Sequence, residues 1–381
     1  MRISRALVAA GLATGLGLVA GCGGSAPPPP AASASSAPAA PSSTAAGAAT
    51  PTTGLLPPGV PTEGVRPATD TLPLAAEPQS APVPTATPPG RQVQVGDAPE
   101  GVVVDPVTRT VAVSKRNPNE LVLLDADTGA VRGRTPLPGF VRHLQLAAPG
   151  GPVLVPVESA NALVRVDLPT GSAEAPIFVG TVPHDVTQAP NGTVLTADEL
   201  GGTVTAVRGD KPVKVFTNGV QPAGMAPVGN VVGMIDVRKN SLNTYDADTL
   251  RILGEAPSGA GPTHLVADRH GRMIATDTRG NQVIVFDPGT TAGQGPRQVA
   301  AIPQPGGPYG ITYDPVRDRL WVASSGTNEL VGYDMTNPQP REVARLATVQ
   351  NPYTVGVDPQ TGRLFVAGVS TGVIQIVDPP A

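Results

Sequence analysis

Cysteine is almost absent from this 381-residue sequence, in which Cys22 is the only one. A single cysteine excludes an intramolecular disulfide, and its position near the N-terminus excludes thiol chemistry in the later, folded part. Aromatic residues are also scarce, at 3% of the chain, so a core must be built mainly from Val, Leu, Ile and Ala. The sequence lacks a P-loop, a nucleophile elbow and a His-Glu-x-x-His helix, and none of these motifs therefore assigns an activity.

Charged residues make up only 15% of the chain, while Gly and Pro number 45 and 46. This balance is typical of a β protein rich in turns. Loss of Arg2 and Arg5 with an N-terminal leader leaves 24 basic and 30 acidic residues, a net charge of −6. A negative protein lacks the basic surface that neutralises phosphate groups, so nonspecific binding to nucleic acid or anionic lipid is disfavoured. No nucleic-acid partner is expected.

The first 21 residues are predicted to be an export signal. Arg2 and Arg5 form a positive start, and the apolar run that follows is too short to span a bilayer comfortably. The run ends in Leu-Val-Ala-Gly-Cys, which resembles the bacterial lipobox and implies that Cys22 is acylated and becomes the new N-terminus. We therefore predict a lipoprotein signal peptide (1–21) and a protein lipid-anchored at Cys22 to the extracytoplasmic face of the bacterial cell membrane. An ordinary secretory leader is the alternative.

The next stretch, residues 22–90, consists largely of Pro, Ala, Ser and Thr, with few large apolar residues. Such a segment buries too little surface to offset its conformational entropy, so it is predicted to be a disordered tether. Its proline content makes it a semi-extended spacer. We expect it to hold the following domain away from the membrane.

A repeated pattern organises the remainder of the chain, residues 91–381. Residues 307–314 read Gly-Pro-Tyr-Gly-Ile-Thr-Tyr-Asp, in which a turn proline precedes alternating small and β-branched residues and then Asp. Units of this kind recur at intervals of 39 to 46 residues. Their turn positions are Pro99, Val141, Pro183, Pro222, Pro262, Pro308 and Pro352. Seven units of several short strands at this period predict an all-β, seven-bladed β-propeller.

The two ends of this region are expected to supply strands of the same blade. The last unit contains three strands, at 353–357, 363–367 and 373–377, and no fourth strand follows. An alternating strand at 92–95 precedes the first unit and is predicted to complete that blade. Closure of the ring removes the exposed sheet edge that would otherwise promote aggregation.

The units resemble YVTN/NHL-type propeller repeats. In these repeats a Pro-x-Gly turn leads into an apolar strand, Asp-Pro, a second apolar strand ending in Val-Ala, and a third strand ending in Asp. Residues 308–334 and 99–125 carry this pattern. The resemblance covers residues 91–381 and implies the propeller fold. It leaves the function open, because the family includes binding proteins, lactonases and lyases.

In a propeller, the innermost strands line a central channel, and the loops that precede them meet around one mouth. The two positions after each turn residue are therefore predicted to converge there. Three of the four His residues fall in this ring, and four consecutive units place a carboxylate near the same mouth, at the end of the second strand. The candidate site residues are His143, His184, Asp185, His264, Glu100, Glu158, Asp198, Asp236, Asp277, Arg142, Tyr309 and Tyr353.

Three interpretations of this ring stay open. First, imidazole and carboxylate groups suit a divalent metal that activates water or polarises a carbonyl. The resemblance to gluconolactonase-type and streptogramin-lyase propellers implies such a metal at the mouth. Second, the same groups form a polar pocket for a small ligand or peptide, with Tyr309 and Tyr353 as apolar walls. Third, they pair with one another and with the backbone to stabilise blade junctions.

The sequence therefore predicts a membrane-anchored extracytoplasmic lipoprotein that acts as a ligand-binding or protein-interaction module. Its partner is an unidentified small molecule or protein. The alternative function is a metal-dependent hydrolase or lyase with its site at the channel mouth. The fourth histidine, His270, is expected in a solvated turn at the opposite face.

Overall fold

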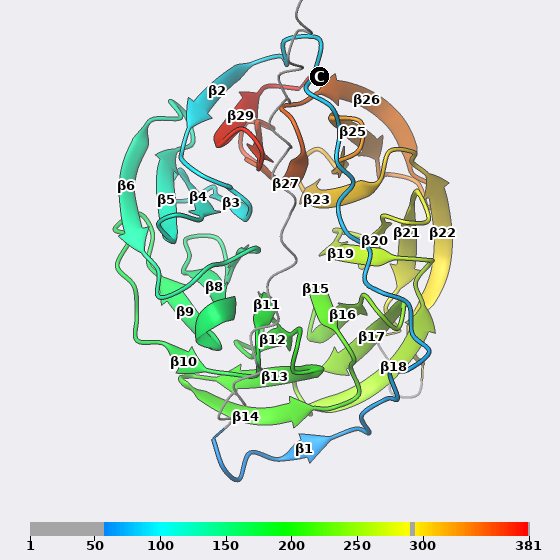
Figure 1. The fold of residues 1–381 in the computed structure, drawn as a ribbon. Helices are drawn as coiled ribbons and strands as arrows, with labels where there is room; N and C mark the ends of the chain where they lie inside the picture. The colour runs from blue at the N-terminus through cyan, green and yellow to red at the C-terminus, as the bar shows by residue number, and fades with distance from the viewer. Residues whose placement is uncertain (1–56, 290–293, 380–381) are drawn as a thin grey trace, which may run out of the picture. The chain divides into compact units, whose positions relative to one another are not determined.

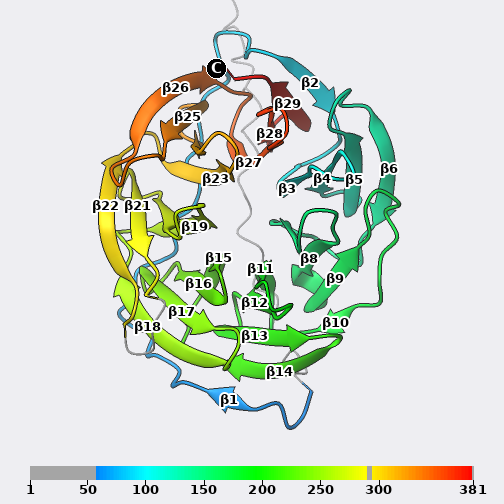
Figure 2. The ribbon, with the colours of Figure 1, turned by 180° about the vertical axis from the view of Figure 1, so that it is seen from behind.

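The computed structural model describes residues 57–289 and 294–379, which form an all-β ring of seven sheets (Figure 1). Each sheet is one blade, and its antiparallel strands follow one another from the centre of the ring outward, as the view from behind also shows (Figure 2). The predicted all-β, seven-bladed propeller is confirmed. The predicted signal peptide, Cys22 and the tether up to residue 56 lie outside the described residues.

The blades follow the chain order, and each contains four antiparallel strands from the channel to the rim, to which blade 3 adds a fifth, parallel strand described below. Blade 1 contains β3 (Val102–Asp105), β4 (Thr110–Lys115), β5 (Glu120–Asp125) and β6 (Val131–Pro136). Blade 2 contains β7 (Gln145–Leu146), β8 (Val153–Val157), β9 (Ala162–Val166) and β10 (Ile177–Phe178). Blade 3 contains β11 (Pro183–Gln188), β12 (Val194–Asp198), β13 (Thr203–Arg208) and β14 (Lys211–Phe216). Blade 4 contains β15 (Pro222–Val228), β16 (Val231–Asp236), β17 (Ser241–Asp246) and β18 (Arg251–Pro257).

The remaining blades have the same plan, with one exception at the end of the chain. Blade 5 contains β19 (Pro262–Ala267), β20 (Met273–Asp277), β21 (Gln282–Asp287) and β22 (Arg297–Pro303). Blade 6 contains β23 (Pro308–Asp314), β24 (Arg319–Ser324), β25 (Glu329–Asp334) and β26 (Arg341–Ala347). Blade 7 contains β27 (Pro352–Val357), β28 (Leu364–Gly368), β29 (Val373–Val377) and, as its outermost strand, β2 (Arg91–Gln94).

Helical structure in the described ranges is limited to one 3-10 turn, η1 (Glu158–Ala160). Among these residues, no helix has the length and apolar character needed to cross a membrane.

The core lies between neighbouring blades. All six residues of β4 are buried, because the sheets of blades 7 and 2 cover its two faces. Val111 of blade 1, for example, shares a cluster with Phe365 and Ile374 of blade 7. The outermost strand β26 is in contrast largely exposed. This arrangement explains why the second strands are continuous apolar runs, because neighbouring blades cover both faces of each strand.

The ring is closed by strands from both ends of the propeller sequence. β2 pairs antiparallel with β29, so that Val93 lies opposite Ile374 and Arg91 opposite Ile376. Val93 also packs against the cluster shared by blades 1 and 7. The predicted closure by the strand at 92–95 is therefore confirmed. It leaves the last blade with the same four strands as the others.

The expectation of a disordered tether up to residue 90 needs correction. Residues 57–90, called the strap below, lie along the propeller rather than apart from it (Figure 1). Their β1 (Thr62–Glu63) adds to blade 3 by pairing parallel with β14. Composition indicates only that such a segment cannot form a core of its own. Here the ring supplies hydrogen-bond partners for the strap backbone, which composition does not reveal.

Candidate functional site

In blades 3 to 7 the turn residue opens an innermost strand that is irregular at its start. The pairing register shifts between Pro183 and Asp185 in blade 3 and between Pro262 and Leu265 in blade 5, as in a β-bulge. Bulges redirect side chains near functional sites. The two positions after the turn residue consequently form two layers. Arg142, His184 and Tyr309 line a small pocket at the mouth, whereas His143 and Asp185 line the channel beneath it.

Arg142 is the centre of the mouth layer. Its Nε and Nη2 atoms donate to the two carboxylate oxygens of Glu158 at 2.6 and 3.0 Å, a bidentate pair. Nη2 also donates to Glu199 Oε2 at 2.5 Å. Both carboxylates are buried, and burial would penalise their charges without a partner. Arg142 therefore stabilises the buried carboxylates of Glu158 from blade 2 and Glu199 from blade 3.

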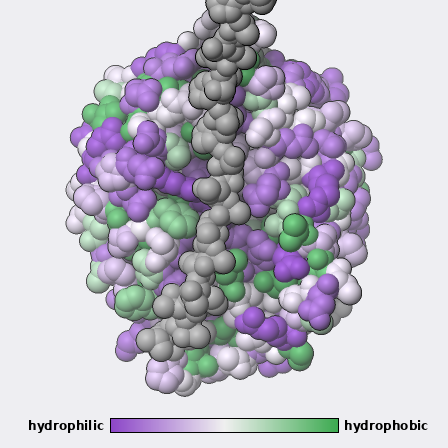
Figure 3. Space-filling view, viewed as in Figure 1, coloured by the Kyte–Doolittle hydropathy of each residue, from purple (hydrophilic) through white to green (hydrophobic). Residues whose placement is uncertain are grey.

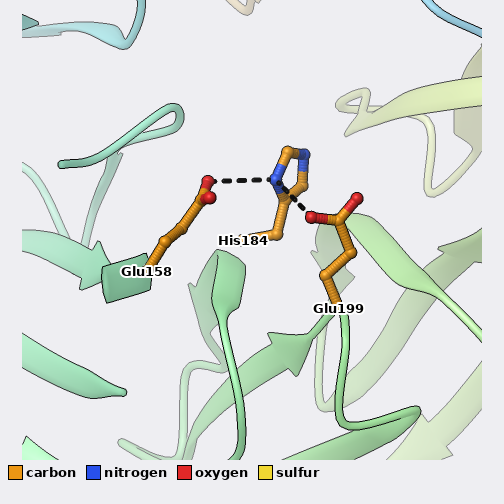
Figure 4. Close-up of side chains that lie close together, drawn as sticks. All are labelled: Glu158, His184 and Glu199. Carbon is orange, nitrogen blue, oxygen red and sulfur yellow. Dashed lines mark hydrogen bonds and ion pairs between the residues drawn. The ribbon is translucent and has the colours of Figure 1, made fainter. Parts of the chain in front are cut away.

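His184 lies between the same two carboxylates (Figure 4). Its Nδ1 is 3.3 Å from Glu158 Oε1 and 3.6 Å from Glu199 Oε2. Burial and the Arg142 charge act to lower the pKa of His184, but the two carboxylates outweigh them and raise it above 6.5. The pKa of Glu199 is lowered despite burial, because His184 and Arg142 stabilise its anion. The cluster is thus a buried network of two acids and two bases.

Among the described residues, Glu158, His184 and Glu199 are also the one group of three or more His, Cys, Asp or Glu residues whose ligand atoms all lie within 4.8 Å of one another, as a metal site requires. The oxygens in question, Glu158 Oε1 and Glu199 Oε2, already accept hydrogen bonds from Arg142. A divalent ion on these oxygens would face a guanidinium at hydrogen-bond distance from the same atoms, and the two cations would repel. This donor set does not fit a divalent metal while Arg142 is in place.

A row of stacked rings continues from His184 across the channel. The centroids of His143 and His184 are 4.5 Å apart, and those of His143 and His264 are 4.6 Å apart, both edge-on. His264 contacts Tyr309 at 4.4 Å, and Tyr309 lies 5.6 Å from Tyr353. Burial, with the nearby His184 charge, lowers the pKa of His264 to about 3 and that of His143 well below 6.5. These two imidazoles are therefore neutral at physiological pH.

Glu100, from blade 1, stands at the other side of the mouth. Its Oε2 accepts a hydrogen bond from Arg116 Nη2 at 2.8 Å. Burial raises the pKa of Glu100, although Arg116 and Arg142 oppose the rise. The structure therefore brings Glu100, Arg142, Glu158, Tyr309, Tyr353 and the three predicted histidines to one region, as the repeat alignment predicted.

Three predicted carboxylates line neither the mouth pocket nor the channel cavity. Asp198 accepts hydrogen bonds from the hydroxyls of Thr196, Thr203 and Thr205. Burial raises the pKa of Asp198 to about 7. Asp236 accepts from the backbone amides of Val220 and Lys239, among others, and Asp277 from those of Ala260 and Gly261. Asp198 therefore supports strands of its own blade, and Asp236 and Asp277 support loops, which corrects their expected convergence with the histidines.

The pairing register explains this difference. Asp198, Asp236 and Asp277 each pair with the first residue of the next strand, five positions later. In blade 2 the residue in that position is Val157, and Glu158 follows it. The position equivalent to Glu158 in blade 3 is therefore Glu199, a residue that is not among the predicted site residues. The sequence signal that identifies Glu199 is the constant spacing of five residues between the last paired residue of each second strand and the first residue of the third strand.

The mouth is covered. Ala75, Ala76 and Glu77 of the strap line the pocket above Arg142 and His184, and its free volume is only about 20 Å³. Below the histidines, a cavity of about 660 Å³ follows the channel. Its lining includes the turns after the innermost strands, for example Pro149 and Pro315, so it opens at the face opposite the mouth. The open volume is therefore not where the sequence placed the site.

Asp185 belongs to this channel rather than to the mouth cluster. It lines the cavity, and its carboxylate accepts hydrogen bonds from the backbone amides of Val186 and Met225, each at 2.8 Å. Burial raises its pKa to about 6, although these amides oppose the rise. Gln145 and Thr187 join the same network, since Thr187 Oγ1 donates to Gln145 Oε1 at 3.0 Å.

No family model and no curated protein matches this sequence. Solved structures do match, and they share one architecture. It is the seven-bladed propeller. Hydrazine synthase from Kuenenia stuttgartiensis aligns with a TM-score of 0.65 at 16% identity, over 77% of this chain and 99% of that chain. A streptogramin B lyase aligns with a TM-score of 0.63 at 17% identity, over 76% of this chain and 97% of that chain.

Virginiamycin B lyase from Staphylococcus aureus is a further similar structure, with a TM-score of 0.59 at 17% identity over 75% of this chain and 99% of that chain. A catalytically inactive His-to-Ala variant of that lyase was solved with quinupristin and aligns with a TM-score of 0.60. At these identities the likeness shows the fold and no more.

Proposed function

We propose that this protein is an extracytoplasmic, lipid-anchored binding module whose central channel takes a small, largely apolar molecule. The observation that carries this proposal is the cavity of about 660 Å³, which opens at the face opposite the strap. Its volume lies within the range of about 300–1,000 Å³ that is usual for small-molecule sites. The lipid anchor rests on the lipobox-like sequence before Cys22.

The lining of the channel indicates the chemistry of the ligand. Apolar side chains such as Leu144, Val266 and Val355 dominate the wall. The polar groups there are largely paired with one another: Gln145 Nε2 donates to the carbonyl of Met225 at 2.8 Å, and Asp185 accepts from two amides. A ligand therefore gains chiefly from apolar burial. At the closed end, the neutral imidazoles of His143 and His264 offer a polar anchor.

Binding of the fluorescent probe anilinonaphthalene sulfonate tests this proposal. Ala267 lines the channel, and an Ala267→Trp variant places a large side chain in it. Val299 lies on β22 away from the channel with 40% of its surface exposed, so Val299→Trp is the matched control. We expect saturable binding to the wild type and the control, and an affinity loss of at least about tenfold in Ala267→Trp, which is about 1.4 kcal/mol. Equal binding to both variants, or none to the wild type, contradicts the proposal.

A second candidate function is a lyase-like enzyme that uses the mouth cluster. The observation that favours it is the position of His184 between Glu158 and Glu199, which raise its pKa above 6.5 against the effects of burial and Arg142. A positioned imidazolium is suited to general acid catalysis. The strap covers this cluster, which is why the binding function is preferred.

Incubation with quinupristin, followed by mass spectrometry, separates the two functions. An enzyme of this kind would convert quinupristin, and a His184→Ala variant would lose that activity while it kept its melting temperature. The binding module predicts no conversion by the wild type. Probe binding in the channel should persist in His184→Ala, because His184 lines the mouth pocket rather than the channel cavity.

A further inference from the structure

The strap is held as a bound peptide would be held. At its first contact, the amides of Val215 and Thr217 donate to the carbonyls of Pro61 and Glu63 at 2.9 and 2.8 Å. These bonds accompany the parallel pairing of β1 with the outer edge of blade 3. Addition of an extended segment to a sheet edge is a common mode of peptide recognition.

Further along, side chains of four blades bind the strap backbone. Each donor is an Arg, Asn or Gln, and each acceptor is a carbonyl oxygen. The pairs are Arg238 Nε to Pro73 (3.0 Å), Arg279 Nη2 to Leu74 (2.8 Å), Gln350 Nε2 to Ala81 (2.9 Å), Asn328 Nδ2 to Pro82 (2.8 Å) and Gln375 Nε2 to Pro89 (2.9 Å). Carbonyl acceptors are present in every residue, proline included, so this recognition selects an extended backbone rather than a particular sequence.

Glycines leave room for the strap side chains. A Cβ atom at Gly261 would lie 2.7 Å from the Cβ of Ala76, and one at Gly307 would lie 2.7 Å from Cδ of Gln79. The same holds at Gly326, where a Cβ would lie 2.6 Å from Gln79 Oε1. The mouth surface is therefore shaped around the occupant as well as hydrogen-bonded to it.

Charge supplies a further element of recognition. Glu77 lines the small pocket together with Arg142 and His184. Nearby, Arg238 donates to the carbonyls of Leu72 and Pro73, and Arg279 donates to that of Leu74. Hydrophilic and hydrophobic residues are interspersed over the coloured part of this face (Figure 3). Binding here therefore relies on hydrogen bonds and a carboxylate more than on an apolar groove.

We propose that the mouth face is a peptide-binding surface for extended, proline-rich segments of other proteins that carry a carboxylate, and that the strap is its built-in occupant. Residues 61–89 contain eight prolines. Proline-rich segments are extended before they bind, so they lose little conformational entropy. Because the strap is covalently attached, its effective concentration is about millimolar, and a foreign segment competes well only when the strap is released.

The experiment uses the full chain with a specific protease site inserted between Thr85 and Ala86. Both residues are exposed. After cleavage, a fluorescent peptide of residues 60–85 is added and its anisotropy is measured. The comparison peptides are the Glu77→Lys peptide and a Gly/Ser peptide of the same length. Circular dichroism of the cleaved protein confirms that the ring stays folded, and the same measurement on uncut protein shows whether the strap blocks the site.

We expect the wild-type peptide to bind cleaved protein and to bind uncut protein at least about tenfold more weakly. Glu77→Lys should weaken binding by about tenfold or more, and the Gly/Ser peptide should bind more weakly still. On the propeller, Arg279→Ala should weaken binding. Arg297→Ala, an exposed arginine paired with Asp287, is the matched control and should leave binding unchanged.

Equal binding of all three peptides, or no binding to the cleaved, folded protein, overturns the proposal. A dimer of uncut protein that becomes monomeric on cleavage also overturns it, since the strap would then occupy the mouth of a second copy of this chain. These readouts do not involve the channel. A failure here and a failure of probe binding in the channel are therefore distinguishable.

Discussion

The Nε2 atoms of His143 and His264 lie 3.2 Å apart, although 121 residues separate them in the sequence. One residue belongs to blade 2 and the other to blade 5, and the central channel lies between these blades. A hydrogen bond between the two rings requires one imidazole to donate and the other to accept. Both rings are buried, and their lowered pKa values keep them neutral.

The neutral state of His264 makes stability depend on pH. Burial holds its pKa at about 3 in the folded protein, against about 6.5 when unfolded. Below pH 6.5 the unfolded chain therefore binds a proton that the folded protein does not. The contribution of His264 to the free energy of unfolding is therefore complete above about pH 6.5. It is lost as the pH falls toward 3, by up to about 1.4 kcal/mol per pH unit.

Urea denaturation of the wild type and of His264→Asn between pH 4.5 and 7.5 measures this contribution. We expect the difference in unfolding free energy between the two proteins to change with pH in this direction. Asp185 and Asp198, whose pKa values are raised to about 6 and about 7, give the opposite slope. They are present in both proteins and cancel in the difference. A difference that does not vary with pH would mean that His264 is not held neutral.

Arg142 is expected to be essential for stability because it neutralises two buried carboxylates. Replacing it with Met leaves Glu158 and Glu199 without their guanidinium partner. Removal of one partner from a buried ion pair typically costs about 3–5 kcal/mol. Arg297→Met, which removes an exposed pair with Asp287, should cost less than about 1 kcal/mol.

Chemical denaturation of the two variants checks the comparison. Adding Glu158→Gln and Glu199→Gln to Arg142→Met should restore part of the stability, because the uncompensated charges are then gone. Similar losses for Arg142→Met and Arg297→Met would show that the cluster is not buried as described.

Ring closure predicts an asymmetry between neighbouring residues of β2. Val93 faces the cluster between blades 1 and 7, whereas Gln94 is exposed. A Val93→Asp variant places a carboxylate against that cluster and should lose about 1–3 kcal/mol of stability. Gln94→Asp should change it by less than about 0.5 kcal/mol. Equal thermal denaturation curves for the two variants would argue against pairing of β2 with β29.

The lipid anchor predicted at Cys22 has a direct test. In a bacterial host that processes lipoproteins, the wild type should incorporate labelled palmitate and fractionate with membranes. Cys22→Ser should do neither, because a hydroxyl group cannot form the thioether bond that attaches the acyl-bearing group to the cysteine sulfur. Label in the Cys22→Ser variant, or none in the wild type, would remove the anchor from the proposed function.

Much of the fold was predictable because spacing and strand count are local properties of the sequence. The interval between turn residues indicated seven blades, and a last unit of three strands indicated that residues near Val93 complete it. The strap was not predictable from composition, since its partners, such as Arg279 and Gln350, belong to distant blades. The composition of a segment indicates whether it can form a core of its own, but not whether another part of the chain offers it hydrogen-bond partners.

The site was predicted in part, for a reason that lies in strand geometry. Successive residues of a strand point in opposite directions, so an alignment error of one position exchanges a loop-supporting carboxylate for one at the mouth. Asp198 and Glu199 illustrate this: the first binds threonine hydroxyls of its own blade, and the second binds Arg142. The pairing of the second strands with the third strands gives this register, and it places Glu199 rather than Asp198 at the position of Glu158.

The measurement that tests the closed ring most directly is the titration of its histidines by NMR. The chain has four histidines, and single substitutions assign their signals. We expect three outcomes together: a pKa above 6.5 for His184, about 3 for His264, and well below 6.5 for His143. Midpoints near 6.5 for all three would mean that blades 2, 3 and 5 do not bring these residues together, and would contradict the account.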